Sequence, residues 1–236
     1  MKEGDFAEID FTGKTEGKIF ETTSAQEAKD GGVFDDKNTY GQVLVVAGKK
    51  MLVPGLDEEV LKGKEGDAKN ISLTADKAFG ARNADLVRLI PSSKFKEQGI
   101  GPVQGMSIDV DGMPARVLGV EGGRVRLDFN HPLAGQNVDY SFKIGKTYSD
   151  AQSKVSAVAK NFFPNSGVTA MLNATVARFS IPIGVRKDGV FIQQKYRAID
   201  VLLSFVPEIK KVVFEEEYGL EKPGEEQKEA TPEAKP

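Results

Sequence analysis

The 236-residue sequence contains no cysteine, no tryptophan and a single histidine, His131. Without cysteine the chain can form no disulfide, no thiol nucleophile and no thiolate-bound metal site. One histidine also argues against a metal centre built from several imidazoles. The first residues, 1–6, lack the apolar core of a signal peptide, and no apolar run approaches the roughly 18 residues that span a bilayer. We therefore expect a cytoplasmic protein without a metal or a cofactor.

The composition is that of an ordinary globular protein, with 39% hydrophobic and 28% charged residues. The net charge of −3 gives no general attraction to nucleic acid or to anionic membranes. Basic residues are scattered rather than grouped with aromatic ones, and the spacing Gly99-Ile100-Gly101 has no strand–helix context that would favour nucleotide binding. We expect no nucleic-acid partner and no membrane partner.

The first part of the chain has the pattern of an antiparallel sheet around one short helix. Pro54 and Gly55 begin the helix and Gly63 ends it. Residues 24–42 are polar and rich in Gly and Asp, which predicts a long loop or a short helix. Alternating or β-branched runs predict strands at 5–12, 18–21, 42–46, 68–73 and 138–144.

Residues 84–129 differ in character from the segments on either side. Asp111-Gly112 and Gly122-Gly123 are signals for tight hairpin turns. They separate three strand-like runs, which are Ser107–Val110, Ala115–Val120 and Val125–Phe129. We interpret this segment as a small β-meander inserted into the first domain.

A separate α+β unit is predicted to begin at residue 149. Apolar residues at helical spacing predict one helix that stops at Pro164 and another that stops at Pro207. Apolar and polar residues alternate over 168–183, which predicts a strand, and we expect a last strand at 209–214. The charged residues 221–236 predict a disordered tail. The expected domain limits are 1–83 with 130–148, then 84–129, 149–220 and the tail at 221–236.

Several short motifs of the first domain carry a resemblance to a known family. They are Asp10-Phe11-Thr12-Gly13, residues 17–22, residues 53–58, Ala78-Phe79-Gly80 and Asn130-His131-Pro132-Leu133-Ala134-Gly135. In these motifs the chain resembles the FKBP-type peptidyl-prolyl isomerases, and the last motif is typical of their SlyD-like branch in its long archaeal form. The resemblance covers about residues 1–148, and the remainder matches the long members more loosely. It implies an α+β fold: an FKBP-like antiparallel half-barrel around a short helix, with an inserted small β domain and a C-terminal α+β domain.

The resemblance also implies a pocket that holds the proline ring of a polypeptide substrate. Phe11 and Phe20 would form aromatic walls, Leu56 the floor, and the N–H of Val53 a donor to a substrate carbonyl. The residues that match the family pattern are Phe11, Phe20, Glu21, Leu52, Val53, Leu56, Phe79 and Tyr140, with Val43 as a less secure match.

Three of these positions depart from the family pattern. Phe79 stands where the family has a tyrosine that donates a hydrogen bond, and Glu21 replaces an aspartate. Leu56 replaces the tryptophan floor of the eukaryotic members. None of these changes removes an apolar pocket, although together they argue against tight binding of macrolide drugs. They leave open a second reading, a holdase chaperone or adaptor whose isomerase pocket is weak or inactive.

Apolar walls suit the expected reaction on physical grounds. Rotation about an X–Pro bond is opposed by amide resonance, with a barrier of about 18–20 kcal/mol. The twisted bond has lost the charge separation of that resonance, so an apolar pocket disfavours it less than water does. No nucleophile, metal or general acid is required. Any one of these residues alone would be read as ordinary core, and the joint match of several separate motifs is what favours a site.

In this family the insert binds unfolded chains, so the resemblance implies chaperone activity and partners that are unfolded or proline-containing polypeptides. Residues that could form an exposed apolar groove are Leu86, Val87, Leu89, Ile90, Phe95, Ile100, Val103, Met106, Ile108 and Met113. The alternative is that they form the insert's own core.

His131 is better explained as a turn residue that orders the hinge than as a base or a ligand. The C-terminal domain could add a client surface or form a homodimer, and we favour the homodimer.

Overall fold

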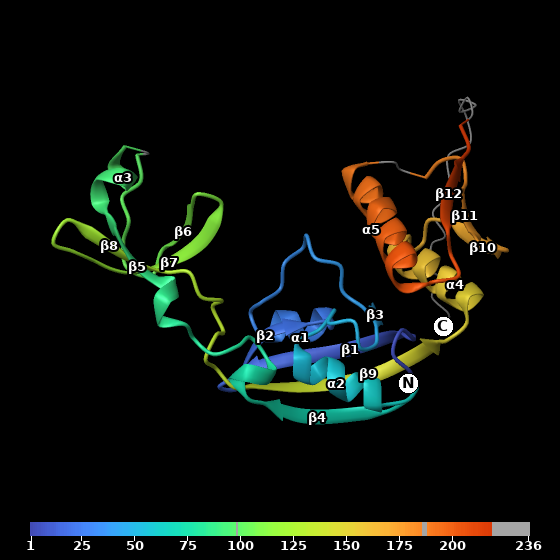
Figure 1. Cartoon of the computed structure of the whole chain (residues 1–236), viewed down its shortest axis with the longest axis horizontal. Helices are drawn as coiled ribbons and strands as arrows, with labels where there is room; N and C mark the ends of the chain where they lie inside the picture. The colour runs from blue at the N-terminus through green and yellow to red at the C-terminus, as the bar shows by residue number, and fades with distance from the viewer. Residues whose placement is uncertain (98, 186–187, 219–236) are drawn as a thin grey trace, which may run out of the picture. The chain divides into compact units, whose positions relative to one another are not determined.

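The computed structural model describes residues 1–97, 99–185 and 188–218 (Figure 1). The chain forms two compact units, Met1–Ser149 and Asp150–Pro236. The first unit contains two separate sheets, and the second contains a third sheet. None of the described helices has both the length and the apolar character needed to cross a membrane. The tail predicted at 221–236 lies outside the described residues.

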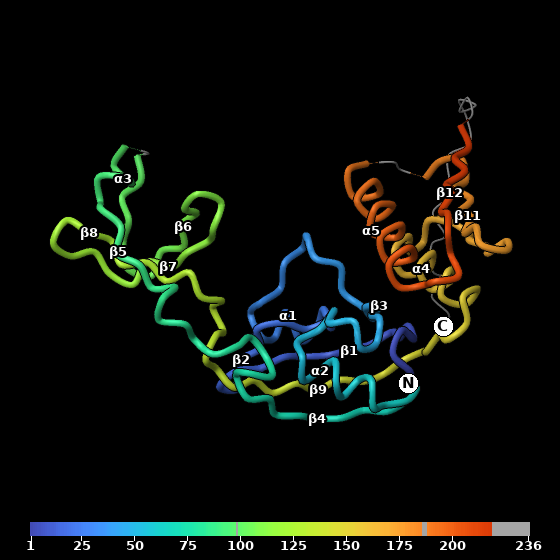
Figure 2. Tube along the Cα trace, in the orientation of Figure 1, coloured from blue at the N-terminus to red at the C-terminus, as the bar shows by residue number. Residues whose placement is uncertain are grey.

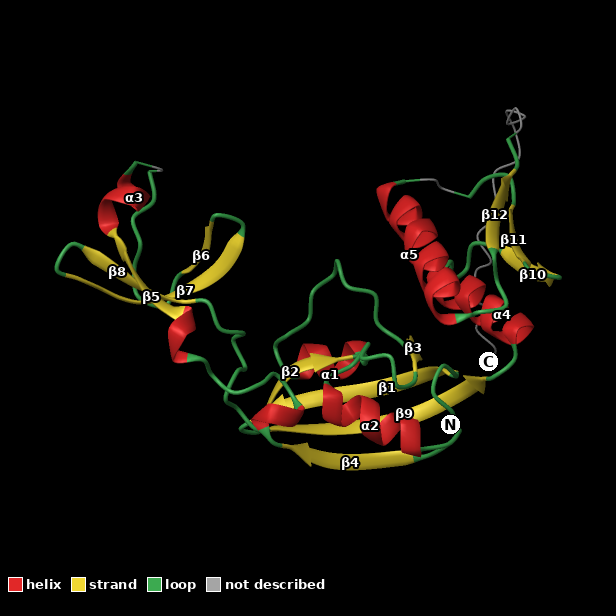
Figure 3. Ribbon diagram, in the orientation of Figure 1, coloured by secondary structure: helices red, strands yellow, loops and turns green. Residues whose placement is uncertain are grey.

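The main sheet of the first unit is antiparallel and packs against helix α2 (Figure 3). Its strand order is β2-β1-β9-β4, and β3 also pairs with β1. The elements are β1 (Phe6–Thr15), β2 (Lys18–Thr22), α1 (Ala25–Asp30), β3 (Val43–Val46), α2 (Pro54–Lys62), β4 (Ala68–Leu73), η1 (Ala75–Lys77) and β9 (Val138–Tyr148). The predicted half-barrel around a short helix is therefore present, and residues 24–42 contain a short helix followed by a loop.

Strand β9 supplies the central part of this domain's core. From Val138 to Ile144 every second side chain is buried, because successive residues of a strand point to opposite faces of the sheet. The buried set is Val138, Tyr140, Phe142 and Ile144. These residues pack with Leu56 and Val60, the buried apolar residues of α2. A single short helix thus closes one face of the sheet.

The insert has its own sheet, with strand order β5-β8-β7-β6. Its elements are η2 (Ala84–Leu86), β5 (Val87–Pro91), α3 (Ser92–Lys96), β6 (Ser107–Val110), β7 (Met113–Glu121) and β8 (Arg124–Asp128). Both predicted hairpin turns are present, and Asp111-Gly112 and Gly122-Gly123 all have positive φ, as tight hairpins require. The first strand, β5, was not predicted, because its residues do not alternate between apolar and polar.

The two chain segments that lead into and out of the insert lie side by side (Figure 2). The backbone N–H of Asn83 donates to Asn130 Oδ1 at 2.8 Å, and Asn130 Nδ2 donates to the Asn83 carbonyl at 2.9 Å. Arg82 forms an ion pair with Asp128 at 2.5 Å. Burial alone would raise the pKa of Asp128, but hydrogen bonds from Asn130 and the Arg82 charge lower it overall. The hinge is therefore held by paired polar groups.

The second unit packs two helices with a three-stranded sheet of order β10-β11-β12. Its elements are α4 (Ala151–Phe162), β10 (Thr169–Asn173), β11 (Val176–Ile181), α5 (Gly189–Phe205) and β12 (Lys211–Glu216). The alternating region 168–183 is a hairpin of two strands rather than one strand, and Ala174 adopts positive φ in its turn. Asp150 and Asp188 cap the two helices by accepting backbone hydrogen bonds. The predicted α+β character of this unit is present.

Asp57, on α2, holds the loop that joins β3 to α2. The residue is 6% exposed, and its carboxylate accepts the N–H groups of Gly48 at 3.1 Å and of Lys50 at 3.0 Å. The loop then continues through Leu52 and Val53 into the helix. An acid on the helix thus fixes the backbone just before the helix begins.

We expect Asp57→Ala to lower the free energy of unfolding by about 2–4 kcal/mol, because two backbone donors lose a charged acceptor. The measurement is urea unfolding followed by far-UV circular dichroism. Glu58→Ala is the control, since its partner Lys77 lies at an exposed position and such pairs contribute about 0–1 kcal/mol. Equal stability of the two variants would contradict this role for Asp57.

Candidate active site

Four aromatic rings from separate segments meet on the side of the main sheet that packs against α2. Phe20, on β2, makes edge contacts with Tyr140 of β9 at 5.8 Å and with Phe79 at 5.6 Å between ring centroids. Phe11, on β1, makes an edge contact with Tyr140 at 6.0 Å. Edge-to-face pairs of this kind stabilise each other beyond simple burial. Phe20 is therefore the centre of a small aromatic cluster.

The cluster has a shielded floor and a partly open rim. Leu56 and Tyr140 are each 1% exposed, so the floor is closed to solvent. The other apolar members expected from the motifs pack on the same core but keep part of their surface exposed: Phe11, Phe20, Leu52, Val53 and Phe79, together with Val43. The cluster therefore presents an apolar surface whose rim is accessible and whose floor is shielded from solvent.

Gly13 makes room for these rings. A Cβ atom at this position would lie 2.6 Å from Phe20 Cζ and 2.9 Å from Tyr140 Cε1. Gly13 is paired directly opposite Tyr140 in the β1–β9 ladder. The glycine therefore lets the two rings approach the sheet more closely than any larger residue would allow.

One polar contact lies at the base of the cluster. The Tyr140 hydroxyl donates a hydrogen bond to Glu21 Oε1. Burial raises the pKa of Tyr140 strongly, and the hydrogen bond to Glu21 and its negative charge add to the increase. The hydroxyl therefore stays protonated at any physiological pH. With this contact, all eight residues expected from the motifs lie together in the structure.

Val53 combines an extended backbone with an available donor. It immediately precedes α2, with φ −58° and ψ 145°, and its carbonyl accepts the N–H of Asp57 at 3.0 Å. Among the described residues, no acceptor is paired with the Val53 N–H. A backbone donor at the rim of an apolar surface is what is needed to orient a substrate carbonyl.

His131 contacts the cluster from the hinge side, a contact that the sequence did not predict. Its ring stacks on Phe79, with centroids 4.4 Å apart and planes inclined by 2°. Its Nδ1 atom accepts the backbone N–H of Leu133 at 3.2 Å. No group of three or more His, Asp or Glu side chains in the described part of the chain could hold a metal ion. His131 thus joins the turn after the insert to the wall of the cluster.

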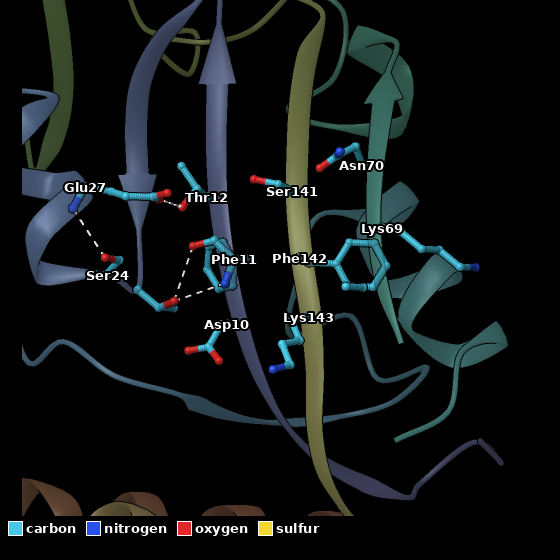
Figure 4. Close-up of a pocket in the computed structure, with 12 residues that line it drawn as sticks. Asp10, Phe11, Thr12, Ser24, Glu27, Lys69, Asn70, Ser141, Phe142 and Lys143 are labelled. Atoms are coloured by element: carbon cyan, nitrogen blue, oxygen red, sulfur yellow. Dashed lines mark hydrogen bonds between the residues drawn. The ribbon is translucent and has the colours of Figure 1, made fainter. Parts of the chain in front are cut away.

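A separate groove of about 410 Å³ lies over the other face of the same sheet (Figure 4). It is lined mainly by polar side chains: Asp10, Thr12, Thr23, Ser24, Glu27, Lys69, Asn70, Ser141 and Lys143, together with Phe11, Ala68 and Phe142. Glu27 accepts hydrogen bonds from the hydroxyls of Thr12 and Thr22. Of the residues expected at the proline pocket, Phe11 alone lines it. The sequence did not predict this groove, because it depends on which polar residues from distant segments become neighbours.

Comparison with known proteins identifies the class. Residues 1–96 match the family described as FKBP-type peptidyl-prolyl cis-trans isomerase, and residues 88–133 match the family described as FKBP26, IF domain. A short-type peptidyl-prolyl cis-trans isomerase of Methanocaldococcus jannaschii is 29% identical over 144 residues, which are 61% of this chain and 92% of that protein. The FKBP-type 16 kDa peptidyl-prolyl cis-trans isomerase of Escherichia coli is 32% identical over 112 residues, or 46% of this chain and 75% of the relative. The SlyD isomerase of Vibrio cholerae is 31% identical over 122 residues, which are 49% of this chain and 59% of that protein.

This chain belongs to the FKBP-type peptidyl-prolyl cis-trans isomerase family. Within that class it has an insert of the FKBP26 type and SlyD relatives. The predictions of the family, of the α+β fold class and of the enzyme class are therefore confirmed. The domain limits and the residues of the pocket stay predictions.

Proposed function

We propose that the aromatic cluster around Phe20 is the pocket in which an X–Pro bond rotates. The observation that supports this most directly is the combination of Phe20, Tyr140 and Phe79 with the available N–H of Val53 at the rim. The proline ring would lie against the aromatic edges, with Leu56 below it. The carbonyl of the bound chain would accept the Val53 N–H.

Rotation is accelerated because the pocket is apolar and partly shielded from water. The planar amide has more charge separation than the twisted one, so loss of water raises the energy of the planar ground state more. The Val53 donor holds one part of the substrate while the bond turns. Each 1.4 kcal/mol by which the site prefers the twisted state gives about a tenfold rate increase.

No hydroxyl of the cluster replaces the one that Phe79 lacks. Tyr140 is 1% exposed, and its hydroxyl is committed to Glu21. The pocket therefore relies on its shape, its shielding from water and a backbone donor. This sparse set of polar contacts is why a holdase or adaptor with a weak isomerase pocket is kept as the second candidate.

Phe20→Ala should lower kcat/KM on short X–Pro peptides by about 10- to 100-fold, because it removes the ring that contacts both Tyr140 and Phe79. The measurement is a protease-coupled isomerisation assay, with circular dichroism to confirm the fold. Phe34→Ala is the matched control, since Phe34 is exposed and stacks on Tyr40 instead. An unchanged rate would remove Phe20 from the pocket.

The second candidate is separated from the first by refolding a model protein whose slow step is proline isomerisation. Acceleration by catalytic amounts of the chain supports the enzyme. Suppression of aggregation without acceleration supports the holdase instead.

We also propose that the insert holds unfolded clients near the pocket. Its core is formed by residues such as Phe95, Ile108 and Leu127, so part of the apolar set expected to form a groove is instead buried. Other apolar side chains remain 38–63% exposed: Leu89, Val103, Met106, Met113 and Val120. Exposed Met and Val residues suit varied extended chains. The proposed clients are unfolded, proline-containing polypeptides, and the cytoplasmic location stays a prediction.

Replacing residues 84–129 with a short linker should leave activity on short peptides within about twofold of the full chain. Activity on an unfolded protein should fall by about tenfold or more, because the client is no longer held at high effective concentration. The adjacent hinge residues Asn83 and Asn130 make the join feasible. An equal loss on both substrates would contradict a separate holding role.

The C-terminal unit is proposed to form a homodimer through α5. The helix buries one face, with Ala198 and Leu202 at 0% exposure. A second apolar stripe on the same helix is partly or largely exposed and has helical spacing: Ile192, Tyr196, Ile199 and Leu203. Such a stripe is typical of a helix that packs against a partner.

Tyr196→Glu should convert the homodimer to a monomer, because Tyr196 is 69% exposed at the middle of this stripe and a buried charge would oppose association. Sedimentation velocity measures the change. Gln193→Glu adds the same charge at an exposed position off the stripe and serves as the control. A wild-type chain that sediments as a monomer would contradict the proposal.

A further inference from the structure

The insert sheet has an outer face that its own core does not use. Along β8 the buried residues are Val125 and Leu127, whereas Arg124 and Arg126 point to the opposite side. Strand pairing places Arg126 between Leu89 of β5 and Gly119 of β7. It places Arg124 between Pro91 and Glu121 in the next row.

These two rows border a groove of about 500 Å³. Its lining is Leu89, Gly119, Glu121, Gly122, Arg124 and Arg126. Leu89 is 60% exposed, so an apolar side chain stands beside the Arg126 guanidinium. Gly119 carries no side chain, so the space beside Arg126 in the groove stays open.

Both guanidinium groups are available for a ligand. Within the described residues, neither Arg124 nor Arg126 makes a side-chain hydrogen bond or an ion pair. Glu121 lies opposite Arg124 in the ladder, but the two side chains form no ion pair. By contrast, Asp128 on the same strand is occupied by Arg82. The two unpaired arginines could bind the anionic groups of a ligand, and the exposed leucine beside them could contact its apolar groups.

The spacing of the arginines indicates the form of that ligand. Residues two apart on a strand are separated by about 6–7 Å, which is also the spacing of alternate side chains in an extended peptide. We propose that this outer face of the insert binds extended client segments in which two carboxylates two positions apart lie next to apolar residues. The proposal rests on the proposed chaperone role of the insert and names the client chemistry that it prefers.

A nucleic acid would be a poorer occupant of the same groove. Glu121 is part of the lining and would repel a backbone that carries a charge at every position, whereas a peptide can place an uncharged residue beside it. Leu89 offers apolar surface that a phosphate backbone does not use. In an extended peptide, glutamates at positions i and i+2 point to one face and would reach Arg124 and Arg126, while an apolar side chain on that same face, at i−2 or i+4, would reach Leu89.

The test uses the full chain and a short fluorescein-labelled peptide without proline, so that the isomerase pocket is not engaged. The peptide carries two glutamates at positions i and i+2 with leucines around them. A second peptide replaces both glutamates with glutamine, which keeps the size but removes the charge. Fluorescence anisotropy gives the Kd of each, at low and at moderate salt.

Arg124→Gln and Arg126→Gln are the test variants, and Arg116→Gln is the matched control. Arg116 is another exposed arginine of the same sheet, on β7 opposite Asp128, and it does not line the groove. Gly119→Leu fills the groove without removing an arginine. Its backbone has no positive φ, and a Cβ there would lie 3.9 Å from Arg126 Nη2, so the fold tolerates the change. Circular dichroism and activity on short X–Pro peptides confirm that each variant is folded.

We expect the glutamate peptide to bind the wild type about tenfold more tightly than the glutamine peptide, with a difference that shrinks as salt rises. Each test variant should remove most of this difference, Gly119→Leu should weaken both peptides, and Arg116→Gln should change neither. Equal binding of the two peptides, an equal loss with Arg116→Gln, or tighter binding of a single-stranded DNA oligonucleotide than of the glutamate peptide would overturn the inference.

The failure of this inference is distinguishable from failure of the proposed chaperone role. Suppression of aggregation of an unfolded protein poor in acidic residues reports on holding in general. If the wild type suppresses that aggregation yet does not discriminate between the two peptides, the chaperone role stands and the carboxylate preference is wrong.

Discussion

The pairing of β9 with β1 on one side and with β4 on the other is the constraint on which the candidate site depends. It places Tyr140 opposite Gly13 and Ile71 in the two ladders. Because side chains alternate between faces, a slip of one residue would turn Tyr140 out of the core and Ser141 into it. The floor of the cluster, its contact with Phe20 and its hydrogen bond to Glu21 are therefore set by backbone pairing between segments that are far apart in the sequence.

A site of this kind needs few reactive groups. Tyr140 stays protonated because burial and Glu21 both raise its pKa, so its hydroxyl acts as a fixed donor within the protein. The rim is apolar, and the donor that we propose for the substrate, the Val53 N–H, belongs to the backbone. That donor is held by the loop geometry that Asp57 maintains. Structural residues of the helix and the loop thus shape the pocket as directly as the rings do.

Local patterns predicted most of the fold. The alternation along 138–144 and the proline–glycine start of α2 identified the sheet and its helix, because burial on one face imposes a period that the sequence must carry. Strand β5 was missed because Val87–Pro91 carries no such period, and residues 168–183 read as one strand because the turn at Ala174 lacks the usual glycine signal. The eight expected pocket residues were predicted through motif resemblance, and they remain a prediction. The stack of His131 on Phe79 and the unpaired arginines of the insert depend on which distant residues become neighbours. Local sequence patterns cannot predict such contacts.

The hydrogen-bonded pair at Asn83 and Asn130 has a consequence for how the chain reaches this structure. For β9 to pair with β1 and β4, the whole segment from 84 to 129 must be closed into a loop, and the entropy lost on closure grows with loop length. If the insert collapses first, its two ends already emerge side by side, and the remaining gap shrinks to a few residues. The order of assembly is then insert before half-barrel, so the module that we propose holds other unfolded chains also helps its own chain to fold.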